Sequence, residues 1–195
     1  MQQESDQIRC FIAVELPEWI KDGLRQIESN LKAHDPSGAK WIDPGSIHLT
    51  LKFLGNVESA KLDSITAKMK DATLATRPYQ LKIQGLGAFP NLRRVQVVWV
   101  GIEGELPKLQ ALQKRLESGL AEMGFPAENR AFTPHLTLAR LRETATAEQR
   151  QALGEFISGS NIEAELTFKV DSFSLIRSQL TRSGAIYTQL ASINL

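Results

Sequence analysis

The tetrapeptide His48-Leu49-Thr50-Leu51 occurs a second time as His135-Leu136-Thr137-Leu138. The chain has 195 residues and only three histidines, and two of the three lie in these identical tetrapeptides. A single His-x-Thr pattern arises readily by chance, but two copies separated by close to half of the chain do not. The pair therefore indicates a duplicated structure with a site that uses both copies.

Each tetrapeptide lies in a segment that we expect to be extended, and side chains alternate between the two faces of a β-strand. His48 and Thr50 then share one face, roughly 7 Å apart along the strand, while the two leucines anchor the other face in a core. His135 and Thr137 have the same arrangement. A strand with a solvated polar face would explain one copy, but it gives no reason for the same residues twice.

The segments around the two tetrapeptides follow one order in each half of the chain: strand, helix, strand, helix, strand. The expected segments of the first half are a strand over 9–16, a helix with its apolar stripe at 20, 24, 27 and 31, extended chain over 41–54 broken near Pro44-Gly45, a helix marked by Leu62, Ile65 and Met69, and a strand over 79–86. The expected segments of the second half are a strand over 94–102, a helix with leucines at 109, 112, 116 and 120, extended chain over 131–141, a helix opened by a capping box at Thr146–Gln149, one long strand over 166–176 and a final strand over 185–193.

This order predicts an α+β fold with two similar lobes related by a pseudo-twofold axis. The repeat halves run from about 8–92 and 93–195, and no linker separates them, so residues 1–195 are expected to form a single domain. A groove between two such lobes is a natural place for a functional site. Because the lobes pack within one chain, a monomer is expected.

The composition is ordinary for a globular protein, with 42% hydrophobic and 23% charged residues. The net charge of +1 excludes the broad basic surface that non-specific duplex binders use. Cys10 is the only cysteine and lies in an apolar run, so we expect a core residue and no disulfide. Residues 1–7 are polar, and no apolar stretch approaches the length of a membrane span, which favours a cytoplasmic protein without a membrane partner.

Two imidazoles on opposite sides of a phosphate suit acid–base chemistry at phosphorus. In-line displacement at a cyclic phosphodiester needs a base at the attacking oxygen and an acid at the leaving oxygen, and the imidazole pKa near 6.5 allows both roles. The hydroxyls of Thr50 and Thr137 would donate to the non-bridging oxygens in the transition state. Metal binding is the competing use of histidine, but no carboxylate flanks either tetrapeptide closely and threonine is a poor zinc ligand. His34, the third histidine, is expected to be solvent-exposed or near a helix C-terminus.

The chain resembles the 2H phosphoesterase superfamily, and more closely the RNA 2′,3′-cyclic phosphodiesterases of bacteria and archaea, also called 2′-5′ RNA ligases. The resemblance covers nearly the whole chain. Its motifs are RCFIAVELP (9–17), SIHLTLKFLG (46–55), AFPNLRR (88–94), FTPHLTLAR (132–140) and the segment 178–190, with Ser178, Gly184 and Tyr187.

The resemblance implies a bilobal fold with a water-filled groove and hydrolysis of a terminal RNA 2′,3′-cyclic phosphate to a 2′-phosphate. It assigns the proton donor to His48 and the proton acceptor to His135, roles that the identical tetrapeptides cannot distinguish by themselves. It implies neither a metal nor a cofactor. The ligase name refers to a slow reversal in which an RNA 5′-hydroxyl replaces water.

Several other residues are candidates for substrate binding. Phe11 is expected to stack on a base, with burial in the core as the alternative. Lys52 is four positions after His48, which places it on the same strand face if the alternation continues. Arg140 departs from simple alternation after His135, and the family resemblance favours a position near the phosphate. The other candidates are Trp41 and Tyr187 as groove-lining side chains, and Arg93 with Arg94 as a loop pair that either contacts RNA or is solvated.

Two alternatives to an RNA-end phosphodiesterase remain open on the sequence. One is a 2H enzyme that acts on a small cyclic nucleotide such as an ADP-ribose cyclic phosphate. The other is a non-catalytic RNA-binding module, which would have no need of two titrating groups.

Overall fold

The computed structural model describes residues 7–33, 35, 38–162, 166–181 and 184–195. His34 therefore lies outside the described residues. Within them, the strands pair only in the antiparallel sense and form two sheets. The first sheet has the order β3 (His48–Glu58), β1 (Gln7–Glu15), β8 (Ser172–Thr181), β9 (Gly184–Asn194). The second has the order β2 (Lys40–Trp41), β6 (His135–Arg140), β5 (Val97–Gly104), β4 (Tyr79–Phe89), β7 (Leu166–Val170).

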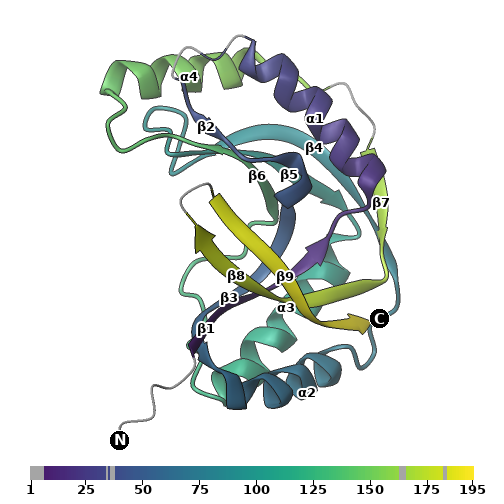
Figure 1. Cartoon of the computed structure of the whole chain (residues 1–195). Coiled ribbons are helices and arrows are strands. Elements are labelled where there is room, and N and C mark those ends of the chain that lie inside the picture. The colour runs from purple at the N-terminus through teal and green to yellow at the C-terminus, as the bar shows by residue number, and fades with distance from the viewer. Residues whose placement is uncertain (1–6, 34, 36–37, 163–165, 182–183) are drawn as a thin grey trace, which may run out of the picture.

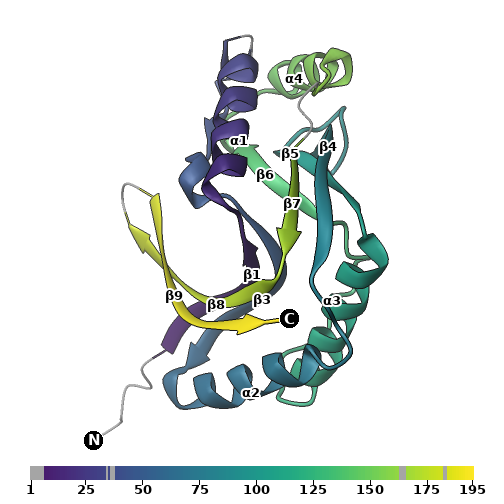
Figure 2. The same cartoon turned by 90° about the vertical axis from the view of Figure 1, so that its right-hand side faces the viewer.

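The helices cover the sheets in two pairs, which lie at opposite ends of the molecule (Figures 1 and 2). Helices α2 (Leu62–Ala72) and α3 (Leu106–Ala121) pack on each other and against β9 and β3 of the first sheet. Helices α1 (Glu18–Lys32) and α4 (Ala147–Gly159) pack against β7 and β4 of the second sheet. Short 3-10 turns occur at η1 (Pro44–Ser46) and η2 (Ser59–Lys61). No helix in the described ranges has the length and apolar character needed to cross a membrane.

The two lobes are not the two halves of the sequence. Strands β8 and β9 come from the second half and complete the sheet that contains β1 and β3, while α1 comes from the first half and covers the second sheet. The single long strand predicted over 166–176 is wrong, because the chain passes from one sheet to the other at Asp171, between β7 and β8. The division near residue 92 therefore does not separate the lobes, which exchange elements.

The other predicted elements are present, with boundaries shifted by a few residues. The stripe residues Ile20, Leu24 and Ile65 are fully buried, and Cys10 is a core residue as expected. The predicted capping box opens α4: Thr146 Oγ1 accepts from the Gln149 amide, and the Gln149 side chain accepts from the Thr146 amide. These two bonds satisfy amide groups that a helix start otherwise leaves without partners.

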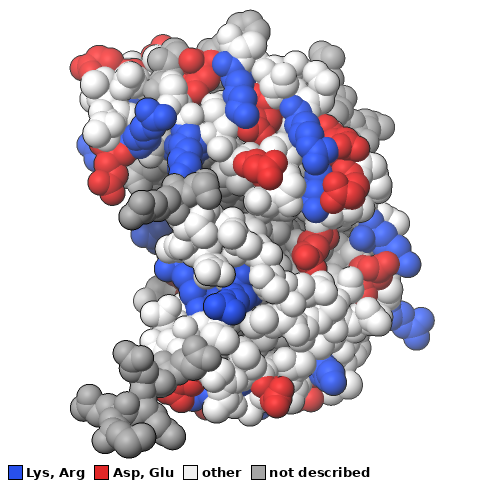
Figure 3. Space-filling view, viewed as in Figure 1, with Lys and Arg blue, Asp and Glu red and all other residues white. Residues whose placement is uncertain are grey.

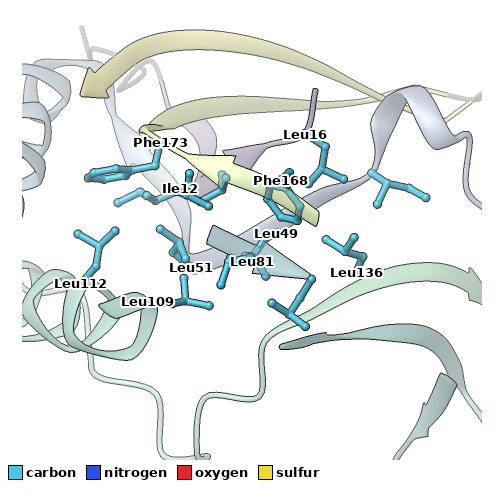
Figure 4. Packing of buried hydrophobic residues seen from close by; sticks show 14 of the residues in the cluster. Ile12, Leu16, Leu49, Leu51, Leu81, Leu109, Leu112, Leu136, Phe168 and Phe173 are labelled. Atoms are coloured by element: carbon cyan, nitrogen blue, oxygen red, sulfur yellow. The ribbon is translucent and has the colours of Figure 1, made fainter. Parts of the chain in front are cut away.

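One hydrophobic core joins both lobes. The leucines of the two tetrapeptides all belong to it, together with residues of α1, α2 and α3. Figure 4 shows Leu49, Leu51 and Leu136 pointing into the same interior, beside Leu109 of α3 and Phe168 of β7. Each fully buried leucine contributes about 1.5–3 kcal/mol relative to an exposed one. The core therefore fixes which face of each motif strand points inward.

Gly154 allows α4 to pack closely on the loop between β4 and β5. A Cβ at this position would lie 1.6 Å from the carbonyl oxygen of Leu92. Alanine favours a helix over glycine by about 1 kcal/mol, but relief of this overlap by movement of helix and loop costs about 1–3 kcal/mol. We expect Gly154→Ala to lower the free energy of unfolding in urea denaturation. Gly159→Ala is the matched control, because no heavy atom lies within 4 Å of its added Cβ; an equal effect of both substitutions would contradict this packing.

Candidate active site

The two motif strands lie next to each other where the two sheets meet. β3 is an edge strand of the first sheet, β6 is next to the edge of the second, and β3 and β6 contact each other. Because Leu49, Leu51, Leu136 and Leu138 point into the shared core, the four histidine and threonine side chains lie on the opposite faces of their strands. All four are partly exposed. Figure 3 shows the surface hollowed on one side, with Lys and Arg side chains above and below the hollow.

A β-bulge follows the threonine in both motifs. Thr50 and Lys52 pair with consecutive residues of β1, so Leu51 is the extra residue; Thr137 and Ala139 pair with consecutive residues of β5, so Leu138 is extra. An extra residue shifts the alternation by one position. The position five residues after each histidine therefore joins the histidine face, and the position four residues after it does not.

This shift places Arg140 on the face of His135 and Thr137, as the family resemblance favoured. It also makes the prediction for Lys52 wrong. The Lys52 side chain is 3% exposed and its Nζ lies 2.6 Å from Glu117 Oε2 of α3. The same ammonium donates to the carbonyl oxygen of Pro126 at 2.9 Å. Lys52 is therefore an internal link between β3 and α3, and Phe53, which is 65% exposed, occupies the face of His48 instead.

Both imidazoles are fixed by the same backbone contact. His48 Nδ1 lies 2.9 Å from the carbonyl oxygen of Ser46, and His135 Nδ1 lies 2.7 Å from the carbonyl oxygen of Thr133. A carbonyl oxygen only accepts, so Nδ1 carries the proton and donates it in both rings. In the neutral ring Nε2 is then the free acceptor, and in the charged ring it is a donor. This contact was not predicted from the sequence, although Ser46 and Thr133 occupy the same position two residues before each histidine.

Aromatic rings hold each imidazole in place. Phe11 stacks on His48 with ring centroids 4.5 Å apart, and Tyr187 meets the same imidazole edge to face at 5.1 Å. Phe89 meets His135 edge to face with ring centroids 4.9 Å apart, and the Trp99 and His135 ring centroids are 6.2 Å apart. The structure thus places Tyr187, a predicted groove-lining residue, beside His48. Phe89 and Trp99 were not singled out from the sequence.

Phe11 is only 3% exposed. Its ring lies between His48, Phe53 and Tyr187, with Phe53 at 6.1 Å and Tyr187 at 5.2 Å between centroids. These neighbours leave little of the ring open to a nucleobase. The core alternative considered for Phe11 therefore describes its position, and the ring supports the imidazole of His48.

Burial and neighbouring charge set the titration of the two histidines. Burial lowers the pKa of both His48 and His135 below the ordinary histidine value, and the carbonyl hydrogen bond opposes this shift in each ring. The nearby charges act in opposite directions. The carboxylate of Glu15 raises the pKa of His48, whereas the guanidinium of Arg140 lowers the pKa of His135.

The comparisons with known proteins identify the family of this chain. The sequence matches the model of the 2′-5′ RNA ligase superfamily over residues 14–182. The chain belongs to this superfamily. One relative, the RNA 2′,3′-cyclic phosphodiesterase of Methanothermobacter thermautotrophicus, is 36% identical over 184 residues, which are 94% of this chain and 96% of that protein. The family resemblance drawn from the motifs is thereby confirmed.

Two solved structures have the same fold as this chain. The crystal structure of Escherichia coli LigT complexed with 3′-AMP has a TM-score of 0.79 and 26% identity, and the match covers 97% of this chain and 99% of that one. A crystal structure of a Thermus thermophilus protein has a TM-score of 0.79 and 28% identity, with 96% and 98% covered. The bilobal 2H phosphoesterase fold expected from the sequence is confirmed.

Trp41 does not line the groove of this protein. It pairs with Ala139, which is buried in the core, so both side chains lie on the core face of the second sheet. Its indole Nε1 donates to Asp35 Oδ2 at 3.1 Å. The preceding residue, Lys40, pairs with Arg140 and is exposed on the histidine face. The prediction for Trp41 is therefore wrong, and Lys40 is a basic residue that the sequence analysis missed.

The described part of this superfamily member contains no group of three or more His, Cys, Asp or Glu side chains arranged to hold a metal ion. The partners of the two imidazoles are instead carbonyl oxygens, aromatic rings and one charged side chain each. This set of groups is suited to proton transfer by the histidines themselves.

Replacement of Lys52 tests its reassignment from the site to the interior. We expect Lys52→Met to lower the free energy of unfolding by about 3 kcal/mol, since it leaves the mostly buried Glu117 carboxylate without its cation. The double variant Lys52→Met/Glu117→Leu should recover part of this loss, because no unpaired charge remains. Urea denaturation of both variants measures the coupling; an unchanged free energy of unfolding in Lys52→Met would contradict an internal ion pair.

Proposed function

We propose that this protein is an RNA 2′,3′-cyclic phosphodiesterase that hydrolyses a terminal 2′,3′-cyclic phosphate to a 2′-phosphate. The observation that carries the proposal is the pair of imidazoles on contacting strands, each with Nδ1 bound to a carbonyl oxygen and Nε2 free for proton transfer. Relatives at up to 36% identity bear this name, which supports the same activity here. The hydrolysis is general acid–base catalysis by two groups.

The reaction needs one proton taken and one proton given. Water attacks phosphorus while Nε2 of His135 accepts its proton, and the bond from phosphorus to the 3′-oxygen breaks. His48 gives its proton to that 3′-oxygen, so the products carry a 2′-phosphate and a 3′-hydroxyl. A second turnover requires only that the two imidazoles return to their starting protonation states. Each proton transfer contributes about 10²- to 10⁴-fold in rate.

The unequal charges beside the two rings support this division of roles. Glu15 is the cross-strand partner of His48 and favours its protonated form, as a proton donor requires. At the equivalent place in the second lobe, His135 pairs with Gly101, which has no side chain. Arg140 favours the neutral form of His135, as a proton acceptor requires. Among the described residues, the charged and titratable groups beside the two rings are Glu15 and Tyr187 for His48, and Arg140 for His135.

The remaining polar groups on the histidine face suit an anionic substrate. In this proposal, Thr50 and Thr137 donate hydroxyl hydrogen bonds to the non-bridging phosphate oxygens, where charge grows in the transition state. Arg140 and Lys40 are neighbouring cations on the same face, which attract a phosphate electrostatically. Tyr187 is 38% exposed beside His48 and offers a ring edge and a hydroxyl to the terminal nucleoside.

Further proposals concern the metal requirement, the reverse reaction, the oligomeric state and the cellular location. We propose that catalysis needs no metal and no cofactor, that slow 2′-5′ ligation is the reverse of the same reaction, and that the protein acts as a cytoplasmic monomer. The substrate is RNA with a cyclic phosphate end, and a small cyclic nucleotide fits the same chemistry. A purely RNA-binding module is disfavoured, because binding does not require two imidazoles with fixed tautomers.

The direct assay uses an oligoribonucleotide with a 2′,3′-cyclic phosphate end. We expect the wild-type protein to yield only the 2′-phosphate product, at the same rate with and without EDTA. His48→Ala and His135→Ala should each lower kcat by about 10²- to 10⁴-fold while circular dichroism shows an intact fold. Full activity of either variant, or a 3′-phosphate product, would remove the proposed mechanism; loss of activity with EDTA would replace it with a metal-dependent one.

The role of Glu15 is visible in the pH profile of kcat/KM. The high-pH limb reports loss of the proton on the donor, and removal of the Glu15 charge lowers the pKa of His48, so Glu15→Gln should move this limb to lower pH. The low-pH limb, set mainly by His135, should stay in place. Glu58→Gln is the matched control, since it removes an exposed carboxylate from the far end of β3. A shift of the low-pH limb instead would reverse the assignment of donor and acceptor.

A further inference from the structure

A hollow of about 560 Å³ lies beside the His135 half of the site. Its lining residues come from the end of β4, the following loop and β5: Gly87, Ala88, Asn91, Leu92, Arg93 and Trp99. The volume is in the range of small-ligand sites, and the lining combines apolar surface with one aromatic ring and one cation. None of these residues has a part in the proton transfers described above.

The hollow is continuous with the reaction site along one row of side chains. Thr137, Trp99 and Gly87 are cross-strand partners on β6, β5 and β4, so all three lie on the histidine face. A Cβ on Gly87 would lie 2.3 Å from the Trp99 ring, which shows that the indole extends over this glycine. The row therefore leads from the phosphate-binding threonine across an indole to the open space beyond it.

The loop that closes the hollow is held in a fixed shape. Asn91 Oδ1 accepts from the amides of Arg93 and Arg94 at 3.0 and 3.1 Å. Behind the loop, Gly154 of α4 packs against Leu92, and Arg150 donates to the carbonyl oxygen of Val95 at 2.8 Å. The Arg93 side chain is exposed at the rim of the hollow. Because the loop backbone is already held, only the Arg93 side chain has to become ordered when it binds a phosphate.

Among the described residues of the first lobe, the corresponding row is Thr50, Ala13 and Ser174, and it contains no aromatic ring. The exposed rings of that lobe, Phe53 and Tyr187, lie outside this row. Ser174 Oγ donates to Glu15 Oε2 at 2.7 Å, so the row ends beside a carboxylate. A carboxylate repels a phosphodiester, whereas Arg93 attracts one.

We propose that the Trp99 hollow binds the nucleotide immediately upstream of the cyclic phosphate end, with its base on the indole and its phosphodiester at Arg93. This subsite rests on the proposed function and narrows its substrate from cyclic nucleotides in general to single-stranded RNA ends. Single-stranded RNA is recognised by this combination of aromatic stacking and phosphate contacts.

The test compares a trinucleotide that ends in a 2′,3′-cyclic phosphate with 2′,3′-cyclic AMP. The wild-type protein should have the higher kcat/KM on the trinucleotide. Trp99→Leu should lower the ratio of the two kcat/KM values by about 5- to 150-fold, which is the loss of one stacked base. The ratio is the readout because Trp99 also neighbours His135, so this variant can lower kcat/KM for both substrates.

Arg93→Ala, on an exposed loop, tests the same subsite with little effect on folding. It should lower the ratio and reduce the slope of log kcat/KM against log salt by about 0.7 on the trinucleotide, as expected for one lost phosphate contact. Arg77→Ala is the matched control, since Arg77 is an exposed loop arginine away from the site, and it should leave both rates unchanged. Equal losses on both substrates would overturn the proposal, because the hollow would then hold the terminal nucleotide.

A binding measurement separates failure of the subsite from failure of the proposed function. A labelled trinucleotide with a 2′-phosphate end serves as the probe in fluorescence anisotropy, with wild-type protein and both variants. Weaker binding to Trp99→Leu and Arg93→Ala supports the subsite even if no substrate is cleaved, in which case only the proposed function fails. Unchanged binding to both variants would overturn the subsite whatever the activity.

Discussion

Alternation of side chains along two strands is the constraint on which the rest of this structure depends. The leucines of both tetrapeptides are buried in one core that spans the lobes, and their burial forces the histidines and threonines onto the opposite faces. A slip of one residue in either strand would bury an imidazole and expose the leucines, at a cost of several kcal/mol. The hydrophobic core thus determines on which strand face the histidines and threonines of the proposed active site lie.

The symmetric frame carries an asymmetric site. Equivalent positions hold Glu15 and Gly101 beside the histidines, Ala13 and Trp99 beside the threonines, and Phe53 and Arg140 after the bulges. The first of these differences favours a proton on His48, and the last favours a neutral His135. The second places an indole on one side only, where we propose that the upstream nucleotide binds. The repeat therefore explains the similar geometry of the two motifs, and two of these three differences support the proposed direction of proton transfer.

The sequence predicted local features well and non-local ones poorly. The helical spacing of apolar residues predicted the helices, and the repeated tetrapeptide predicted that two histidine–threonine strands lie together. The bulges at Leu51 and Leu138 were not predicted, because one extra residue in a strand leaves its composition and hydrophobicity unchanged. Because the bulge at Leu51 was missed, Lys52 was assigned to the wrong face of β3. The passage of the chain from the second sheet to the first at Asp171 was also missed. Buried residues continue on both sides of Asp171, and β7 and β8 differ only in the distant strands with which they pair.

The central claim is that both imidazoles present Nε2 to a single phosphate group. A crystal structure of the protein with bound 2′-AMP, which has the 2′-phosphate and 3′-hydroxyl of the proposed product's terminal nucleotide, tests it most directly. The account predicts Nε2 of His48 and of His135 within about 3 Å of oxygens of the same phosphate, with both Nδ1 atoms still on their carbonyl oxygens. A phosphate that contacts only one of the two motifs, or rings that turn Nδ1 towards it, would contradict the account.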